Sequence, residues 1–363
     1  LRVSMEELKK RKDAVVEELR AGIEKQLAAA KVDLYRGTGV VCGEHLVKVM
    51  PGEEEVTADY ILLAAGSEPS SLPIPGMDLP GVKNSTQMLE EECVPDRLVI
   101  IGGGVIGMEF ATVYNDLGCQ VTVLEAMDKI LPGMDKEISQ NLKMIMKKRG
   151  VDIHTGATVS SVEKMGDGTY LCRYTEKEKN CEAPAALILS AVGRRPLSRG
   201  LFSEDMQERI EMEGGRVLVN ERYETSVPGI YAIGDLIGGV CLAHVAAAEG
   251  CQAASAMFPE LKGKDMTVIP SCVYTDPEIA CAGLTADEAK AAVHSAGKAV
   301  AGKYDEVKMN IELARLSDEQ EDVFSDIGRM LFLMHTGAVK DTVMSDEGEK
   351  SPQQVIDALL VSA

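Results

Sequence analysis

The most constraining feature of this sequence is a glycine run between two segments of different periodicity. Gly102-Gly103-Gly104-Val105-Ile106-Gly107 follows a predicted strand at Leu98–Ile101 and opens a predicted helix at Val105–Leu117. In such a unit Gly102 permits a tight turn, Gly104 lets the main chain approach a diphosphate, and Gly107 allows close packing of helix on strand. The N–H groups at the helix start favour a negative charge. The run therefore predicts a dinucleotide site.

A carboxylate follows the glycine run at the spacing that such a site needs. The next predicted strand, Gln120–Glu125, ends in an acid roughly 20 residues after the loop. A carboxylate there accepts hydrogen bonds from both ribose hydroxyls and repels a 2′-phosphate. Glu125 therefore favours NAD over NADP.

Strands and helices alternate after Arg97, which predicts a parallel sheet covered by helices on both faces. A second helix is expected at Lys136–Arg149. The remaining strands of this region are expected at Val151–His154, Ala157–Lys164, Tyr170–Tyr174 and Ala186–Val192.

The region before the glycine run has a different organisation. Ser4-x-x-Glu7 predicts the start of a long amphipathic helix that ends near Ala30. A connector rich in Pro and Gly, Ser71 to Gly81, marks a domain boundary. Strands are expected before it at Val32–Tyr35, Val40–Cys42, Leu46–Val49 and Tyr60–Ala65.

One strand end is repeated within the sequence. Leu62 to Pro69 and Leu189 to Pro196 share an apolar strand, a small residue, a glycine, two further residues and a proline. Two copies of this strand-end motif suggest two related nucleotide-binding domains, the second inserted into the first.

Two later motifs are weak when taken singly. Thr225 to Asp235 ends a strand in Gly-Asp, which more often marks a simple turn. Leu242-Ala243-His244 opens a helix, and a lone histidine there is more often structural than catalytic. Their order along the chain changes this interpretation.

Five motifs occur here in an order that resembles the flavin-dependent pyridine nucleotide–disulfide oxidoreductases, and within them the dihydrolipoamide dehydrogenases. The resemblance runs from about Val3 to Lys303. The motifs are Ala64-Ala65-Gly66-Ser67, the glycine run with Ile106 and Glu109, Thr225 to Asp235, Leu242-Ala243-His244, and Tyr274-Thr275-x-Pro277-Glu278.

The resemblance implies a set of cofactor-binding residues. For NAD they are Gly102, Gly103, Gly104, Val105, Ile106, Gly107, Glu109, Glu125, Val159 and Gly193. For FAD they are Gly39, Ala65, Gly66, Ser67, Asp235, Cys241, Leu242, Ala243 and His244. Asp235 would hold the ribityl chain, and the helix starting near Leu242 would direct its positive end at the flavin.

The resemblance also implies an α/β fold, with a doubly wound NAD-binding domain at residues 82–198. It would be inserted into an incomplete FAD-binding domain made of residues 1–81 and 199–262. A divergent α+β interface or dimerisation domain would occupy residues 263–363.

The sequence departs from the family in two places. The family carries a second glycine fingerprint and a Cys-x4-Cys redox pair, whereas no two of the nine cysteines here have that spacing. The family's terminal His-Pro and Glu are also missing, and His335 has no matching context. We therefore assign no catalytic residue, regard the ADP half of the FAD site as missing, and expect the full dithiol reaction to need more than these residues.

Three interpretations stay open. The chain is a dihydrolipoamide dehydrogenase-like oxidoreductase, truncated or completed by a separate redox polypeptide; or a non-catalytic dinucleotide-binding remnant or assembly partner; or a related NADH-dependent disulfide reductase or oxidase. The first implies a partner that carries lipoamide or a small disulfide substrate, and a possible homodimer.

The charge and the cysteine content limit the ligands and the cellular compartment that we expect for this protein. With 38 basic and 58 acidic side chains the net charge is −20, which disfavours the binding of nucleic acid, because nucleic acid is itself negatively charged. We expect no membrane span and no metal site, because no long apolar run or CxxC occurs. Nine scattered cysteines predict reduced thiols in the cytoplasm.

Overall fold

The computed structural model of this chain describes residues 4–52, 54–264, 266 and 268–292. It divides the chain into two compact units, Leu1–Gly283 and Leu284–Ala363. The first unit holds nearly all of the described residues, and the account below concerns that unit. The predictions about His335 and the terminal segment fall outside the described residues.

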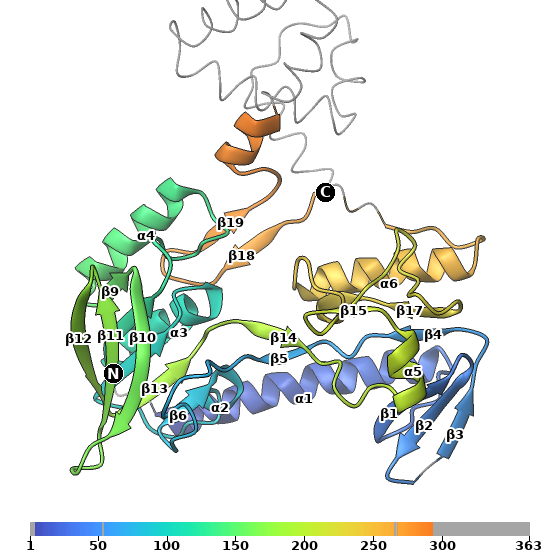
Figure 1. Cartoon of the computed structure of the whole chain (residues 1–363), viewed down its shortest axis with the longest axis horizontal. Coiled ribbons are helices and arrows are strands. Elements are labelled where there is room, and N and C mark those ends of the chain that lie inside the picture. The colour runs from blue at the N-terminus through green and yellow to red at the C-terminus, as the bar shows by residue number, and fades with distance from the viewer. Residues whose placement is uncertain (1–3, 53, 265, 267, 293–363) are drawn as a thin grey trace, which may run out of the picture. The chain divides into compact units, whose positions relative to one another are not determined.

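A five-stranded parallel sheet forms the centre of the region around the glycine run (Figure 1). Its order is β6 (Val82–Asn84), β13 (Leu187–Ser190), β7 (Arg97–Ile101), β8 (Gln120–Glu125) and β9 (Asp152–Thr155). The α/β fold class with a parallel sheet is thus confirmed. Because parallel strands share a direction, β7 and β8 bring the glycine run and Glu125 to the same edge.

The two faces of this sheet are covered by different kinds of element. Along β7, Leu98 and Ile100 enter one core with helices α3 (Val105–Asp116) and α4 (Lys136–Lys148). Val99 and Ile101 enter a second core with an antiparallel sheet. The strands of that sheet are β10 (Ala157–Lys164), β11 (Tyr170–Glu176) and β12 (Lys179–Ala185).

The prediction of helices on both faces was therefore wrong for one face. The sequence analysis also missed β12, whose run of Lys, Asn, Glu and Pro184 does not read as a strand. β12 is an edge strand, where a proline is tolerated because its missing N–H faces no neighbour. Its inward residues, Ala183 and Ala185, are buried in the second core.

A third core joins segments that lie far apart in the sequence. Strand β4 (Ile61–Leu63) pairs in parallel with β17 (Ile230–Ala232), and both bury side chains with Phe202 and Met206. This sharing is what an inserted nucleotide domain requires, although the proposed domain limits remain a prediction. The neighbouring elements are β1 (Thr38–Gly43), β2 (Leu46–Met50), β3 (Glu54–Thr57), α5 (Glu204–Arg209) and α6 (Ala243–Met257).

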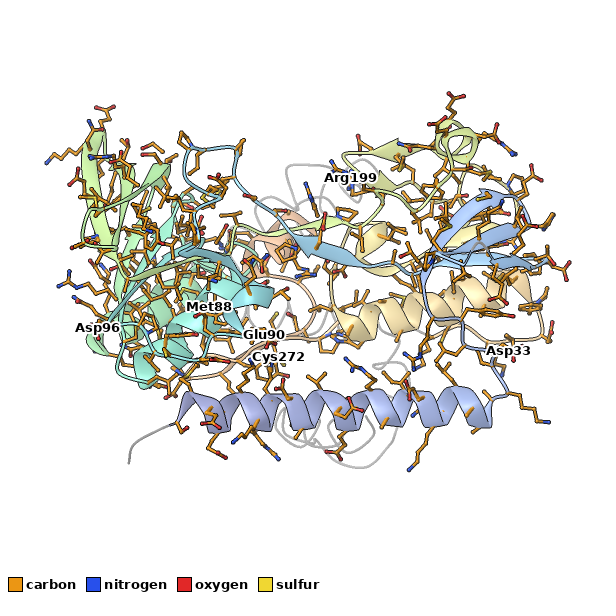
Figure 2. The ribbon with its side chains drawn as sticks, turned by 90° about the horizontal axis from the view of Figure 1, so that it is seen from below. Asp33, Met88, Glu90, Asp96, Arg199 and Cys272 are labelled. Carbon is orange, nitrogen blue, oxygen red and sulfur yellow. The ribbon has the colours of Figure 1, made fainter. Side chains whose placement is uncertain are left out.

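The predicted N-terminal helix is present as α1 (Met5–Ala29), with Ser4 as its N-cap accepting from the Glu7 N–H at 3.4 Å. None of its side chains is buried. Lys12 Nζ donates to the Leu89 carbonyl oxygen at 3.3 Å and pairs with Glu90, which lies on the side of the body that faces α1 (Figure 2). Among the helices that the structure describes, none combines the length and apolar character needed to cross a bilayer.

The strand predicted at Val32–Tyr35 is absent. Val32, Leu34 and Tyr35 stay 50%, 54% and 45% exposed, so no neighbouring strand or core stabilises an extended segment there. The remaining short elements are β5 (Ser67–Pro69), α2 (Ser85–Met88), β14 (Arg194–Pro196), β15 (Met212–Glu213), β16 (Arg216–Val217), η1 (Gly234–Leu236), β18 (Ser271–Val273) and β19 (Ile279–Cys281).

Candidate dinucleotide-binding site

Two glycines of the run, Gly102 and Gly107, are required by close main-chain contacts, and a third, Gly103, is tightly packed against side chains. Gly102 has a φ of +107°, and a Cβ on it would lie 2.4 Å from the carbonyl oxygen of Ala191. A Cβ on Gly107 would lie 2.0 Å from the Gly102 carbonyl oxygen, and one on Gly103 would lie 3.0 Å from the Glu125 Cβ. These positions hold the strand, the loop and the helix together at close range.

Gly104 differs from the other three. A Cβ there would meet nothing within 4 Å, and its φ of −72° is open to any residue. Gly104 is the N-cap of α3, and no side chain caps that helix or places an acid in its first turn. Open space, free helix N–H groups and the positive end of the helix dipole together make a place for an anion.

Glu125 lies beside this loop, at the end of β8. Its Oε2 accepts from the Gly103 N–H at 2.5 Å, and its Oε1 accepts from the Met127 N–H at 2.7 Å. The residue is only 7% exposed. Each carboxylate oxygen has two lone pairs, so capacity for ribose hydroxyls remains. Sequence reasoning missed that this acid also ties two loops together.

The other predicted NAD residues lie in different settings. Val105 is exposed and Ile106 half-buried at the start of α3. Glu109 accepts from the Tyr274 N–H at 2.9 Å, which joins α3 to the end of β18. The Val159 side chain is buried in the second core, so only its main chain could meet a ligand. Gly193, at a φ of +108°, has open space where a Cβ would point.

The predicted FAD residues Ser67 and Asp235 meet at a second pair of strand ends. Ser67 begins β5, two residues beyond Ala65 and the positive-φ Gly66 that follow β4. Asp235 is in η1, which follows β17, the parallel neighbour of β4. The Ser67 Oγ donates to Asp235 Oδ2 at 2.5 Å.

The Gly-Asp turn is supported from behind by Glu249 of α6. Glu249 is 8% exposed, and its Oε2 accepts from the Gly234 N–H at 2.6 Å. Burial raises the pKa of Glu249 above its ordinary value, the Gly234 hydrogen bond opposes this, and the charge of Asp235 adds to it. Glu249 belongs to the motif around His244, but we did not select it from the sequence as a site residue.

The segment Cys241 to His244 leads into α6, which has Leu242 as its N-cap and begins at Ala243. His244 Nε2 lies 2.9 Å from the Pro270 carbonyl oxygen. Burial raises the pKa of the Cys241 thiol, and the Asp235 charge adds to the rise, so this thiol is not activated as a nucleophile. Gly39 is exposed in β1, which belongs to the separate three-stranded sheet with β2 and β3.

Sequence reasoning also missed Arg194 as a functional candidate. Its Nε donates to Ser67 Oγ and its Nη2 to the Ser67 carbonyl oxygen, both at 2.7 Å. The signal was available, because Arg194 lies within the repeated strand end that the sequence shows twice. Those two copies pair with each other as β5 and β14.

All nine cysteines are free thiols. Burial raises the pKa of Cys119 to about 11 and that of Cys172 to about 12. Over the described residues, no group of three or more His, Cys, Asp or Glu side chains could hold a metal ion.

The chain is similar in sequence to curated dihydrolipoyl dehydrogenases. The chain is 36% identical over 311 residues to a dihydrolipoyl dehydrogenase of Bacillus subtilis, which covers 81% of this chain and 64% of that protein. It is 38% identical over 283 residues to a dihydrolipoyl dehydrogenase of Chlamydia pneumoniae, covering 77% and 60%. The chain thus spans less than two thirds of the length of each of these relatives.

A solved structure shares the fold. The HOCl-induced flavoprotein disulfide reductase RclA from Escherichia coli superposes with a TM-score of 0.71 at 28% identity, covering 80% of this chain and 66% of that one. Residues 2–250 match the family described as pyridine nucleotide-disulphide oxidoreductase. The chain therefore belongs to the pyridine nucleotide-disulphide oxidoreductase family.

Proposed function

We propose that this chain binds NAD(H) and the flavin half of FAD, and serves hydride transfer between them in a dihydrolipoyl dehydrogenase-like oxidoreductase. The observation that carries the proposal is the open space at Gly104, beside an uncapped helix start and the Glu125 carboxylate. A glycine with ordinary φ and no steric need is explained by a ligand that approaches its backbone.

The residues around the glycine run are suited to bind the adenosine and diphosphate parts of NAD. The N–H groups at the start of α3 would receive the diphosphate, and the remaining lone pairs of Glu125 would accept from the ribose hydroxyls. A 2′-phosphate beside a buried carboxylate would be repelled, which favours NAD over NADP. Gly193 would offer open backbone on the neighbouring strand end.

The residues also fit part of FAD. Asp235, with one oxygen held by Ser67, keeps its other oxygen for hydroxyls of a ribityl chain. The start of α6 would place partial positive charge near the flavin. When bound, FAD supplies a group that accepts a hydride from NADH and passes electrons onward. The described residues contain one glycine fingerprint, which leaves the adenosine half of FAD without an equivalent cradle.

Exchange with a dithiol needs a cysteine pair and a base. None of the 363 residues forms a Cys-x4-Cys pair. We propose that these groups come from another polypeptide segment. We also propose that the electron acceptor is a lipoamide-bearing protein or a small disulfide, and that the enzyme is a homodimer. We propose that the protein is located in the cytoplasm, because all nine of its cysteines are free thiols.

A second candidate is a flavin disulfide reductase with another acceptor, which the likeness to the Escherichia coli disulfide reductase favours. A non-catalytic dinucleotide-binding remnant is the least supported alternative, because the Ser67–Asp235 arrangement beside the start of α6 has no use in a protein that binds NAD alone.

The test is an absorbance spectrum of the purified chain after incubation with FAD and removal of free cofactor, with intact mass checked and NADH binding titrated by fluorescence. A flavin band together with NADH binding is the expected result. NADH binding without flavin would favour the remnant, and binding of neither cofactor would overturn the proposal. Adding a polypeptide with a Cys-x4-Cys pair, then comparing lipoamide with other disulfides, separates the two enzyme candidates.

A further inference from the structure

The two repeated strand ends of the sequence form a small antiparallel sheet between the two candidate cofactor sites. Strand β5 follows Gly66, and β14 follows Gly193. In their register, Ser67 lies opposite Pro196, Glu68 opposite Arg195, and Pro69 opposite Arg194. A residue of β14 therefore follows directly on the candidate NAD site and reaches the candidate FAD site.

Arg194 is that residue. Its guanidinium makes two hydrogen bonds to Ser67 across the sheet, one to the hydroxyl and one to the carbonyl oxygen, both at 2.7 Å. The Arg194 Nε also lies 4.0 Å from Asp235 Oδ2, with side chains that are 34% and 23% exposed. The positive charge is thus placed beside the carboxylate that we expect to hold the ribityl chain.

The hydroxyl of Ser67 transmits this order to Asp235. A serine hydroxyl has one hydrogen to donate and lone pairs that accept. Because it accepts from Arg194, its hydrogen is directed to Asp235 Oδ2, at 2.5 Å. One oxygen of Asp235 is thereby held, and the direction of the other oxygen follows from it.

The start of β14, where Arg194 lies, directly follows Gly193 of the candidate NAD site. Gly193 has a φ of +108° and open space around it, and its carbonyl oxygen accepts from the Ser70 N–H at 2.9 Å. A ligand against Gly193 would restrict the backbone from which the Arg194 side chain extends.

We propose that Arg194 is a positioning residue that links the two cofactor sites, so that NADH bound beside Gly193 tightens the hold of Ser67 on Asp235. The inference rests on the proposed function, because it takes NADH as the ligand at Gly193. It adds a coupling between the sites that neither cofactor contact supplies alone.

Arg195 provides a matched control. It is adjacent in sequence, lies on the same strand and pairs with Glu68 at 2.8 Å across the same sheet. Its side chain is 56% exposed. Arg195→Gln removes the same charge and a comparable cross-strand pair without touching Ser67 or Asp235.

The experiment is amide hydrogen exchange of the intact chain, with and without saturating NADH, on peptides that cover residues 66–70 and 234–242. In the unmodified chain and in Arg195→Gln, NADH should slow exchange in both segments by about threefold or more. Arg194→Gln should still bind NADH within about twofold, yet lose this slowing at 234–242. Arg194→Lys, which keeps the charge but not the forked geometry, should recover part of it.

The outcomes separate the inference from the proposed function. If the unmodified chain does not bind NADH by fluorescence titration, the proposed function fails. If NADH binds but the slowing at 234–242 is absent, or persists equally in Arg194→Gln, the coupling through Arg194 is wrong. Melting temperatures of the two Gln variants exclude a general loss of folding as the cause.

Discussion

Replacing Gly104 and Gly107 by alanine, one at a time, would separate the binding role of the glycine loop from its folding role. Both lie in the same turn, and both would gain a single methyl group. At Gly107 that methyl would lie 2.0 Å from the Gly102 carbonyl oxygen, whereas at Gly104 it meets nothing within 4 Å. The two variants should therefore differ in which property they lose.

For Gly107→Ala the loss should be in stability. Alanine in a helix gains about 1 kcal/mol over glycine, but an overlap with a main-chain oxygen forces the helix away from the strand. A net loss of about 2–3 kcal/mol corresponds to a fall of roughly 5–10 °C in melting temperature. Differential scanning fluorimetry measures this directly.

For Gly104→Ala the loss should be in binding. The N-cap position prefers glycine to alanine by about 0.5–1 kcal/mol, so the melting temperature should fall by no more than about 3 °C. The methyl group would occupy the space through which the diphosphate reaches the helix N–H groups, and NADH affinity should fall at least about tenfold, or 1.4 kcal/mol.

The matched control is Gly22→Ala in α1, where a Cβ also meets nothing within 4 Å and no cofactor is expected. It should leave NADH binding unchanged. A folded Gly104→Ala protein that binds NADH as well as the control does would refute the assignment of the diphosphate to this loop. So would a loss of stability in Gly104→Ala equal to that of Gly107→Ala.

Three further predictions concern titratable groups. Glu125→Gln leaves the Gly103 or the Met127 N–H without its acceptor, so stability should fall by about 1–3 kcal/mol and NADH should bind less tightly; an unchanged melting temperature and titration would contradict this. Burial lowers the pKa of His154, but its contacts with Asp152 and Glu176 outweigh burial and raise it above 6.5. This stabilisation is fully present below pH 6.5 and is lost as pH rises through the raised pKa, so His154→Gln should reduce the stability difference between pH 6 and pH 9 in thermal unfolding. Because burial raises the pKa of Glu249, its ionised form is unfavourable; Glu249→Gln should be tolerated, whereas Glu249→Ala should lower the melting temperature by leaving the Gly234 N–H unpaired.

The core of the nucleotide region could be predicted from local patterns. Leu98–Ile101, the glycines and Gln120–Glu125 follow one another closely, so their strand, turn and helix preferences are expressed within one short unit. β12 and the absent strand at Val32–Tyr35 could not be predicted in this way. Whether such a segment becomes a strand depends on a neighbour that pairs with it, and β11 supplies one for β12.

The site shows the same division. The sequence by itself identified the candidate binding residues: the glycine run and Glu125 by residue type and spacing, and Ser67 and Asp235 by resemblance to a known family. Only the tertiary structure decided that Arg194 holds Ser67, that Glu125 ties two loops together, and that Glu249 supports the Gly-Asp turn. Apart from the short Glu125–Met127 contact, these hydrogen bonds join residues 15 to 127 positions apart. Their partners are chosen by the packing of strand ends, which no local pattern in the sequence specifies.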